Sequence, residues 1–476
     1  MKRENGKRYG IRLLKFMHYC LTLGIFYICW LLFRYGTLRG MNAYGFRYNY
    51  YVLAGYGICI YFFNRTYNAY LLGYMRIREL AFSQFLSQFF SAGIVWLVVC
   101  AAWDRWRWPW YFFAGIAVQA VLDAVWSYLT NGYFCRCHPP KKTILIYRNE
   151  RDKRRFGAIH GKPTERLYTV EKELRYEGHG FTEIRDQMEG YEAIFVAGVH
   201  SRCRNGIAKY CKEKGIVGFF LPHVGDVIMQ GARHIQTFDS PVLYVSRAYL
   251  NPEYALIKRL FDVAASVGMM ILLSPVILVT AAAIHFYDGG PAIYKQVRLT
   301  EGGREFEIYK FRSMRVDAEK DGVARLSTGE NDDRITPIGR WVRKARLDEI
   351  PQLWNIAKGD MSFVGPRPER PEIAEQYYET LPDFRLRLQV KAGLTGYAQV
   401  YGKYNTDPYE KLEFDLLYIN NMNVFTDLRL LFATFGILFK AESTEGIAEG
   451  QFTAMDYEEH PADGDRAEED AVVSGR

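Results

Sequence analysis

Two adjacent carboxylates, Asp348 and Glu349, lie in the segment RKARLDEIPQLWNIAKGDMSFVGPRPERP, residues 343–371. Arg343 opens this segment, and Arg367 stands between two prolines near its end. A carboxylate beside arginines is suited to attack a phosphorus centre, and an acidic pair can also hold Mg²⁺ together with substrate phosphates. The prolines stiffen the backbone around Arg367, which would aim its guanidinium at phosphate oxygens. The segment indicates phosphate chemistry, although such a cluster taken alone is more often a set of surface salt bridges.

The residues around the acidic pair predict two short helices. Pro337 can open one helix, and Asp348 can cap the next, with Pro351 in its first turn. The pair would then lie at a helix N-terminus, where the dipole, Arg343 and Arg346 would depress the pKa of a carboxylate. Adjacent helical positions diverge by about 100°, so we expect the two acids to have different roles.

A β-hairpin is predicted upstream, in YKQVRLTEGGREFEIYKFRSM (residues 294–314). Its strands alternate around the turn sequence EGGR. Lys310 and Arg312 would emerge close together on one side of the second strand, because side chains at i and i+2 share a face. They are candidates to join the phosphate-binding cations.

An apolar segment of membrane-spanning length covers residues 263–285 and is interrupted at Ser274-Pro275. Proline removes a helical hydrogen bond, so we expect a bend there, with the Ser274 hydroxyl satisfying part of the exposed backbone. A fifth, kinked span is the alternative, but it would carry a basic domain across the membrane, against the positive-inside tendency. We therefore expect a re-entrant helix that enters and leaves on the same side.

The first third of the chain is rich in apolar and aromatic residues. Four segments there predict membrane-spanning helices, each near the roughly 20 residues that a bilayer requires: 13–33, 48–64, 84–104 and 109–131. A buried helical domain is the alternative interpretation. The basic N-terminus, MKRENGKRYGIR, favours a cytoplasmic start, and four crossings would return the chain to the cytoplasm.

A small α/β domain of Rossmann type is predicted next. Its short buried strands would be TILIYR (143–148), AIFVAG (193–198), VGFFLP (217–222) and PVLYV (241–245), with a helix at 201–215. The first strand is followed by YRNERD, whereas a dinucleotide site requires GxGxxG at that position. We expect no dinucleotide cofactor here, and a regulatory or dimerisation role.

Composition narrows the classes of partner. The 476 residues carry a formal charge of +8, which becomes +17 over residues 1–440 because an acidic tail follows. We expect that tail, residues 441–476, to be disordered. The basic body is compatible with anionic lipid, phosphorylated ligands or nucleic acid. Nucleic acid is the weakest reading, since the cations gather around carboxylates and a membrane helix.

The motifs of the last third occur together in a characteristic order. They are KRLFD, the helix broken at Ser-Pro, YKQVRLTEGGREFEIYKFRSM, RLDEIPQLWNIAKGDMSFVGPRP and KAGLTGYAQVYG. Over about residues 256–440 the chain resembles the bacterial sugar transferase family, the monotopic polyprenyl-phosphate glycosyl-1-phosphate transferases. The N-terminal spans and the α/β domain resemble the larger architecture of that family. The resemblance implies an α-helical membrane bundle (1–138), a Rossmann-like domain (139–250), a mostly helical monotopic catalytic domain (251–440) with a re-entrant helix and a short hairpin, and the tail.

The resemblance implies a reaction and its residues. Such enzymes transfer a sugar-1-phosphate from a nucleotide diphosphate sugar, usually a UDP-sugar, to polyprenyl phosphate and release UMP. Asp348 would attack the β-phosphate to form a covalent intermediate, and Glu349 would bind Mg²⁺ or position the incoming groups. Further site residues fall on family positions: Arg343 and Arg367 on phosphates, Lys310 and Arg312 in the K-F-R-S motif, and Asp427 near the nucleotide or metal.

The resemblance also implies a setting. The enzyme would be a multi-pass protein of the bacterial inner membrane, with its active site at the cytoplasmic face, and a homodimer. One position departs from the family pattern: Arg346 stands where many members have serine two residues before the aspartate. A non-catalytic scaffold that binds nucleotide sugar or lipid phosphate is the alternative function, but it would not need these motifs together.

Overall fold

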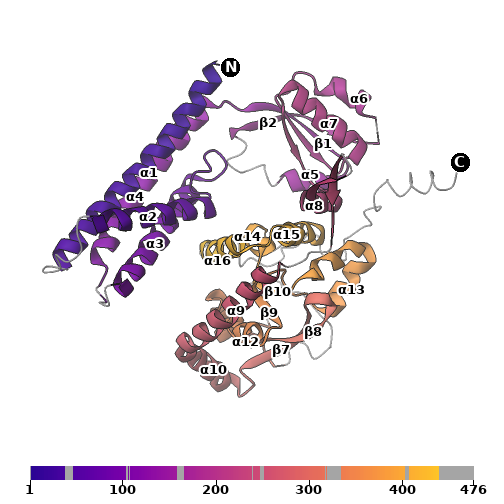
Figure 1. Cartoon of the computed structure of the whole chain (residues 1–476). Helices are drawn as coiled ribbons and strands as arrows, with labels where there is room; N and C mark the ends of the chain where they lie inside the picture. The colour runs from indigo at the N-terminus through magenta and orange to yellow at the C-terminus, as the bar shows by residue number, and fades with distance from the viewer. Residues whose placement is uncertain are drawn as a thin grey trace. The chain divides into compact units, whose positions relative to one another are not determined.

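The computed structural model describes residues 2–37, 47–102, 106, 108–157, 166–178, 180–237, 240–246, 251–316, 318, 334–402 and 407–438. The predicted acidic tail, 441–476, lies outside these residues. The chain divides into two compact units, Met1–Leu221 and Pro222–Arg476 (Figure 1).

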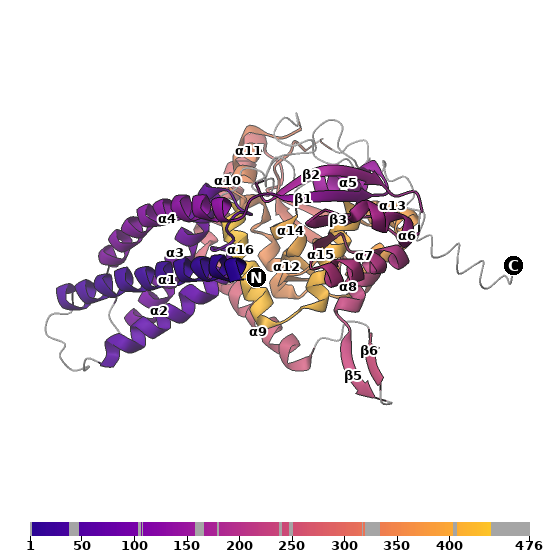
Figure 2. The same cartoon turned by 90° about the horizontal axis from the view of Figure 1, so that it is seen from above.

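Four long helices open the first unit and lie side by side (Figures 1 and 2): α1 (Lys2–Thr37), α2 (Arg47–Thr66), α3 (Ile77–Ala102) and α4 (Trp110–Cys137). Three stretches are long and apolar enough to cross a membrane: Tyr9–Arg34, Ile77–Ala102 and Trp110–Cys137. The four predicted segments correspond to these four helices, but α2 is not apolar enough over a sufficient length to be counted among the spanning stretches. Its tyrosines and asparagines leave it without a sufficiently apolar stretch, although Val52, Tyr56 and Ile60 are buried in the bundle.

A four-stranded parallel sheet follows in the same unit, with strand order β2-β1-β3-β4. Its strands are β1 (Lys141–Tyr147), β2 (Tyr168–Arg175), β3 (Ala193–Ala197) and β4 (Val217–Phe220), and its helices are α5 (Glu150–Gly157), α6 (Phe181–Arg185), the 3₁₀ turn η2 (Asp186–Met188) and α7 (Ser201–Lys214). Three predicted strands and the predicted helix are confirmed. Strand β2 was not predicted; it is an edge strand whose residues alternate half-buried and exposed.

The fourth predicted strand, PVLYV, has a different place. It forms β6 (Ser240–Tyr244), which pairs antiparallel with β5 (Arg233–Thr237) in a two-stranded hairpin of the second unit. The prediction of a buried strand there is wrong, because every residue of β6 is exposed. An apolar run this short does not reveal on its own whether a sheet covers it.

The second unit is mostly helical (Figure 2). Its remaining elements are α8 (Val224–Gln230), α9 (Pro252–Leu272), α10 (Ser274–Asp288), β7 (Ile293–Leu299), η3 (Glu301–Gly303), β8 (Glu305–Phe311), α11 (Pro337–Lys344), η4 (Leu347–Glu349), α12 (Gln352–Lys358), β9 (Met361–Val364), α13 (Pro371–Thr380), η5 (Pro382–Gln389), β10 (Ala392–Thr395), α14 (Tyr397–Tyr401), α15 (Pro408–Asn420) and α16 (Val424–Leu438). Its main core gathers apolar side chains from β8, β9, β10, α12 and α15, with Ile356 and Leu412 fully buried.

Helices α9 and α10 form a bent apolar pair, with an angle of 63° at the break. The predicted bend at Ser274-Pro275 is confirmed, and the Ser274 hydroxyl donates to the Ile271 carbonyl at 2.7 Å, as expected. Apolar side chains around the bend are strongly exposed; Leu272 is 76% and Leu278 69% accessible. This tip therefore exposes apolar surface that is poorly suited to water.

The other end of α9 is anchored in the second unit. The Arg259 guanidinium donates to the carbonyls of Ile356 and Ala357 at the end of α12, at 2.8 and 2.7 Å. The Asp262 carboxylate accepts from the backbone N–H of Phe363, the third residue of β9. These bonds connect the apolar tip to the elements that surround the acidic pair.

The predicted hairpin is confirmed. Strands β7 and β8 pair antiparallel in continuous register from Ile293 opposite Phe311 to Leu299 opposite Glu305. The turn η3 joins them, with Gly302 and Gly303 at positive φ, a conformation that glycine adopts without steric cost. Lys310 is the next-to-last residue of β8, so the hairpin delivers this cation toward η4.

Candidate functional site

The acidic pair lies on a single 3₁₀ turn, η4, rather than in the first turn of an α-helix. The prediction that Asp348 caps the following helix is wrong: α12 begins at Gln352, with Pro351 at its N-cap position. Arg346 enters the turn with φ of 55°, a left-handed conformation that arginine rarely adopts. The reversal there separates η4 from α11, which ends at Lys344.

The prediction that Pro337 opens a helix is confirmed by α11. The Thr336 hydroxyl caps it by accepting from the Gly339 N–H at 2.9 Å. Gly339 packs so closely on the Ser313 carbonyl that a Cβ would lie 1.9 Å from it. The K-F-R-S motif therefore continues from β8 into the contact that positions α11.

Glu349 is held by two cations. The Arg367 Nη2 donates to Glu349 Oε1 at 2.8 Å, and the Lys310 Nζ lies 3.8 Å from the same oxygen. The Glu349 side chain is 17% exposed and that of Lys310 22%. Three predicted site residues, from β8, η4 and the loop after β9, are thus brought together.

Asp348 differs from its neighbour. Its carboxylate accepts no hydrogen bond from, and makes no ion pair with, any residue that the structure describes. Burial, and then the charge of Glu349, raise the pKa of Asp348 from 3.8 to about 6. The two adjacent acids thus have different surroundings: cations bind the Glu349 carboxylate, whereas no described residue binds the Asp348 carboxylate.

The pKa of Glu349 shifts the other way. Burial pushes it upward, but Arg367 and Lys310 outweigh burial and lower the pKa to about 2. The predicted depression therefore belongs to Glu349, and the prediction for Asp348 is wrong. A one-turn 3₁₀ segment supplies little of a helix dipole, so burial and the negative charge of Glu349 outweigh the nearby cations at Asp348.

The pKa of Lys310 lies closer to neutral pH than that of an ordinary lysine. Burial, together with the positive charges of Arg367 and Arg298, lowers its pKa to about 8, while Glu349 opposes the shift. The ammonium is therefore mostly protonated at neutral pH.

The arginines predicted for phosphate binding occupy two different places. The Arg343 Nε donates to the Ser313 hydroxyl at 2.8 Å, and its positive charge acts on the pKa of Asp348. Arg312 is buried and forms a two-pronged ion pair with Asp288 at the end of α10. Arg343 thus belongs to the surroundings of the acidic pair, whereas the contacts of Arg312 hold the base of the bent helix pair.

Asp427 lies in a separate buried cluster. Its Oδ2 accepts from the Tyr254 hydroxyl at 2.8 Å and from the Lys258 ammonium at 2.6 Å. Its Oδ1 accepts from the Tyr418 hydroxyl, which also donates to the Val364 carbonyl. These contacts join α16 to α9, α15 and the end of β9, and none of them reaches the acidic pair.

The loop that carries Arg367 follows β9 and runs against the end of β10. Gly365 and Gly393 face each other so closely that a Cβ on Gly393 would lie 2.1 Å from the Gly365 nitrogen. The Gly393 N–H donates to the Pro366 carbonyl, and the Gly365 N–H donates to the Thr395 carbonyl, both at 2.8 Å. The backbones of the G-P-R-P and K-A-G-L-T-G motifs are therefore hydrogen-bonded to each other next to Arg367.

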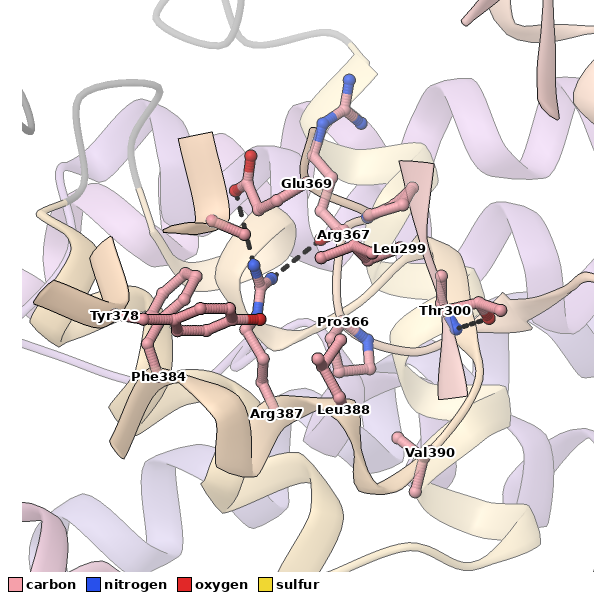
Figure 3. A pocket seen from close by; sticks show the side chains of 13 residues that line it. Leu299, Thr300, Pro366, Arg367, Glu369, Tyr378, Phe384, Arg387, Leu388 and Val390 are labelled. Atoms are coloured by element: carbon pink, nitrogen blue, oxygen red, sulfur yellow. Dashed lines mark hydrogen bonds and ion pairs between the residues drawn. The ribbon is translucent and has the colours of Figure 1, made fainter. Parts of the chain in front are cut away.

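A small pocket lies beside this loop (Figure 3), lined in part by Glu369, Tyr378, Phe384 and Arg387. Three residues here were not predicted as part of the site: Glu369 at the end of the loop, and Arg387 and Arg298, which contact the loop. Arg298 and Glu369 stand inside motifs that were quoted, so a search for cations and acids adjoining those motifs would have included them.

The acidic pair fits a hard divalent cation. Among the described residues, no three histidine, cysteine, aspartate or glutamate side chains gather as metal ligands. Two carboxylates are nevertheless sufficient for Mg²⁺, which keeps several waters and takes further oxygens from a bound phosphate. Asp348 and Glu349 would be the residues that hold it.

The opposite pKa shifts predict opposite effects on stability at pH 7.5 in metal-free buffer. Asp348→Asn should raise Tm, because the ionised form of a group with a raised pKa costs free energy in the native state. This gain should shrink as the pH falls from above 6 toward 4.

Glu349→Gln should lower Tm, because ionised Glu349 stabilises the native state above its ordinary pKa of 4.5. That stabilisation is lost as the pH falls toward 2. Thermal melts in detergent test this, and equal directions for both variants would contradict the assignment.

Comparison with known proteins places the second unit in a family. Residues 253–441 match the family described as bacterial sugar transferase, close to the extent predicted from the motifs. Over 187 residues the chain is 40% identical to UDP-N-acetylgalactosamine-undecaprenyl-phosphate N-acetylgalactosaminephosphotransferase of Aeromonas hydrophila. The aligned region covers 39% of this chain and 44% of that protein. Over 211 residues it is 39% identical to UDP-glucose:undecaprenyl-phosphate glucose-1-phosphate transferase of Klebsiella pneumoniae. This aligned region covers 43% of this chain and 43% of that protein. The chain thus spans less than half the length of these two relatives.

A shorter relative is matched over most of its length. The chain is 46% identical over 136 residues to the putative undecaprenyl-phosphate N-acetylgalactosaminyl 1-phosphate transferase of Bacillus subtilis (strain 168), which covers 28% of this chain and 74% of that protein. The range that matches the family contains the acidic pair, the hairpin, the bent helices and the loop of Arg367. This chain belongs to the bacterial sugar transferase family.

Proposed function

We propose that the protein transfers a sugar-1-phosphate from a nucleotide diphosphate sugar, of the UDP-hexose class, to polyprenyl phosphate and releases UMP. The observation that carries the proposal is the division of roles in η4, where cations engage Glu349 and leave the Asp348 carboxylate available. The relatives, named as undecaprenyl-phosphate sugar phosphotransferases, support the same acceptor and donor classes. A non-catalytic scaffold would have no use for an unengaged carboxylate among phosphate-binding cations.

Asp348 acts as the nucleophile in the first step. With a pKa of about 6 it is ionised at neutral pH and more basic than an ordinary carboxylate, which favours attack. Its oxygen forms a bond to the β-phosphorus of the donor, and the bond from that phosphorus to the oxygen bridging the α-phosphate breaks. The electron pair leaves with UMP, and the sugar phosphate remains as an acyl phosphate on Asp348.

The lipid acceptor completes the reaction in the second step. An oxygen of polyprenyl phosphate attacks the same phosphorus, and the bond to Asp348 breaks, so the free carboxylate returns. Dividing one displacement into two lets donor and acceptor use the same site in turn.

The cations around η4 stabilise phosphate charge in both steps. Arg367 offers a planar fork for phosphate oxygens, and Lys310 a compact point charge. Arg343 supplies a further positive charge near Asp348. We assign Arg312 to holding α10 instead, because its guanidinium is paired with Asp288. Mg²⁺ held by the two acids would neutralise charge on the diphosphate.

The bent helix pair suits a lipid substrate. Its exposed apolar tip would be immersed in one leaflet, and Arg259 and Asp262 attach the same helix to the unit that carries the acidic pair. We therefore propose a re-entrant helix that holds the site at the cytoplasmic face of the inner membrane, where nucleotide sugars are made. The Rossmann type of the α/β region, its regulatory role and a homodimer remain predictions.

The transfer reaction is tested by UMP release. Purified protein should release UMP from a UDP-sugar in repeated turnovers only when polyprenyl phosphate and Mg²⁺ are present. Asp348→Asn should reduce the rate by more than about a thousandfold, because it removes the nucleophile. The exposed Asp383 provides the control, since Asp383→Asn should keep the wild-type rate. A near wild-type rate in Asp348→Asn would rule out the covalent route.

The re-entrant helix is tested by paired topology reporters. A reporter fused after Val245 precedes the bent pair, and one fused after Ser443 follows it. Both should report the cytoplasm, since a re-entrant helix returns the chain to its original side. Reporters on opposite sides would show that α9 and α10 cross the membrane as one kinked span, whatever the number of preceding crossings.

A further inference from the structure

The Arg367 loop is held from within the protein by a second arginine. Arg387, on η5, is only 3% exposed. Its Nη2 donates to the backbone carbonyl of Arg367 at 2.8 Å, and its Nε donates to Asp415 Oδ2 at the same distance. Its Nη1 lies 3.4 Å from Glu369 Oε1. Figure 3 shows this guanidinium between Glu369 and the Arg367 carbonyl, with the Arg367 side chain directed away from it.

Glu369 joins this guanidinium to other cations. The Lys411 ammonium lies 3.5 Å from Glu369 Oε1, and the Arg298 Nη1 donates to the Pro368 carbonyl at 3.1 Å. Burying an arginine without partners is costly because its charge loses its hydration, so these acids and carbonyls are what allow Arg387 to remain inside. Arg387 and Arg298 therefore bind successive residues of the loop, Arg367, Pro368 and Glu369.

The backbone at Arg367 has little freedom of its own. Prolines on both sides restrict it, and Gly365 is pressed against Gly393. The carbonyl direction at Arg367 therefore determines where its side chain leaves the loop. That side chain leads to Glu349 Oε1, 2.8 Å from its Nη2.

We propose that Arg387 is a positioning residue for the transfer reaction. By holding the Arg367 carbonyl, it directs the Arg367 guanidinium to Glu349 and to the phosphate that reacts. It touches neither the acidic pair nor the reacting atoms, so it acts only through Arg367. The assignment rests on the proposed function as far as rates are concerned, whereas its effect on the loop is independent of that function.

A matched pair of arginines tests the proposal. Arg387→Lys keeps the charge but loses the fork, so it cannot hold Arg367, Asp415 and Glu369 together. It should lower kcat about a hundredfold, as expected when a reacting group is misplaced by about 1 Å, with KM for the UDP-sugar changed less than about threefold. The control is Arg385→Lys, two residues away, where an exposed guanidinium lies over the Tyr378 ring at 4.6 Å. It should keep the wild-type kcat.

A double-mutant cycle separates positioning from general damage. In an Arg367→Ala background, Arg387→Lys should lower kcat no further, because the group that it positions is already gone. Multiplying losses in the double variant would overturn the proposal, as would a wild-type kcat in Arg387→Lys. If Arg387→Lys fails to fold, Asp415→Asn, which weakens the hold on the Arg387 Nε, is measured in the same cycle.

Hydrogen exchange gives a readout that does not depend on activity. Amide exchange in residues 364–370 should be faster in Arg387→Lys and unchanged in Arg385→Lys. Equal exchange in both variants would overturn the proposal even if the wild-type protein released no UMP. Faster exchange with an inactive wild type would instead keep the positioning role and reject the transfer reaction.

Discussion

Unequal engagement of two adjacent carboxylates is the constraint on which the rest of the site depends. Two neighbouring acids in a half-buried turn repel each other, and the pair is tolerable only if positive charge compensates it. Here Arg367 and Lys310 compensate one member, whereas burial and then the charge retained on Glu349 raise the pKa of Asp348. The two cations on Glu349 thus leave one acid stabilised as an anion and the other without a cationic partner among the described residues.

These ion pairs need three separate elements at one point. The β7–β8 hairpin carries Lys310, the turn after α11 carries the acids, and the loop after β9 carries Arg367. Backbone contacts keep them there: Gly339 packs against Ser313, and Gly365 packs against Gly393. At both contacts a Cβ would meet backbone atoms, so the site depends on close approach of main chains more than on long side chains. The same unit carries the apolar tip of the bent helices, which we propose is immersed in one leaflet.

Local signals in the sequence predicted much of this fold. The EGGR turn between alternating strands, the proline that opens α11 and the Ser-Pro break are features of a few residues, and the structure agrees with each. The distribution of charge depends on residues far apart and was not predictable in this way. Lys310 and Arg312 look equivalent by spacing, yet Lys310 approaches Glu349, whereas Asp288 captures Arg312. The pKa of Asp348 was predicted in the wrong direction, because a helix was expected where the left-handed Arg346 starts a 3₁₀ turn. Arg387 was missed because nothing in its neighbours shows that it lies behind the loop.

The central claim is that Asp348 becomes covalently attached to the sugar phosphate. Mixing the protein with a UDP-sugar and Mg²⁺ in the absence of polyprenyl phosphate isolates the first step. Intact-mass spectrometry should then show one added sugar phosphate per chain, located on the peptide that contains Asp348, together with one equivalent of UMP. Addition of polyprenyl phosphate should remove the adduct. Turnover with the lipid present, but without any adduct or stoichiometric UMP in its absence, would contradict the account.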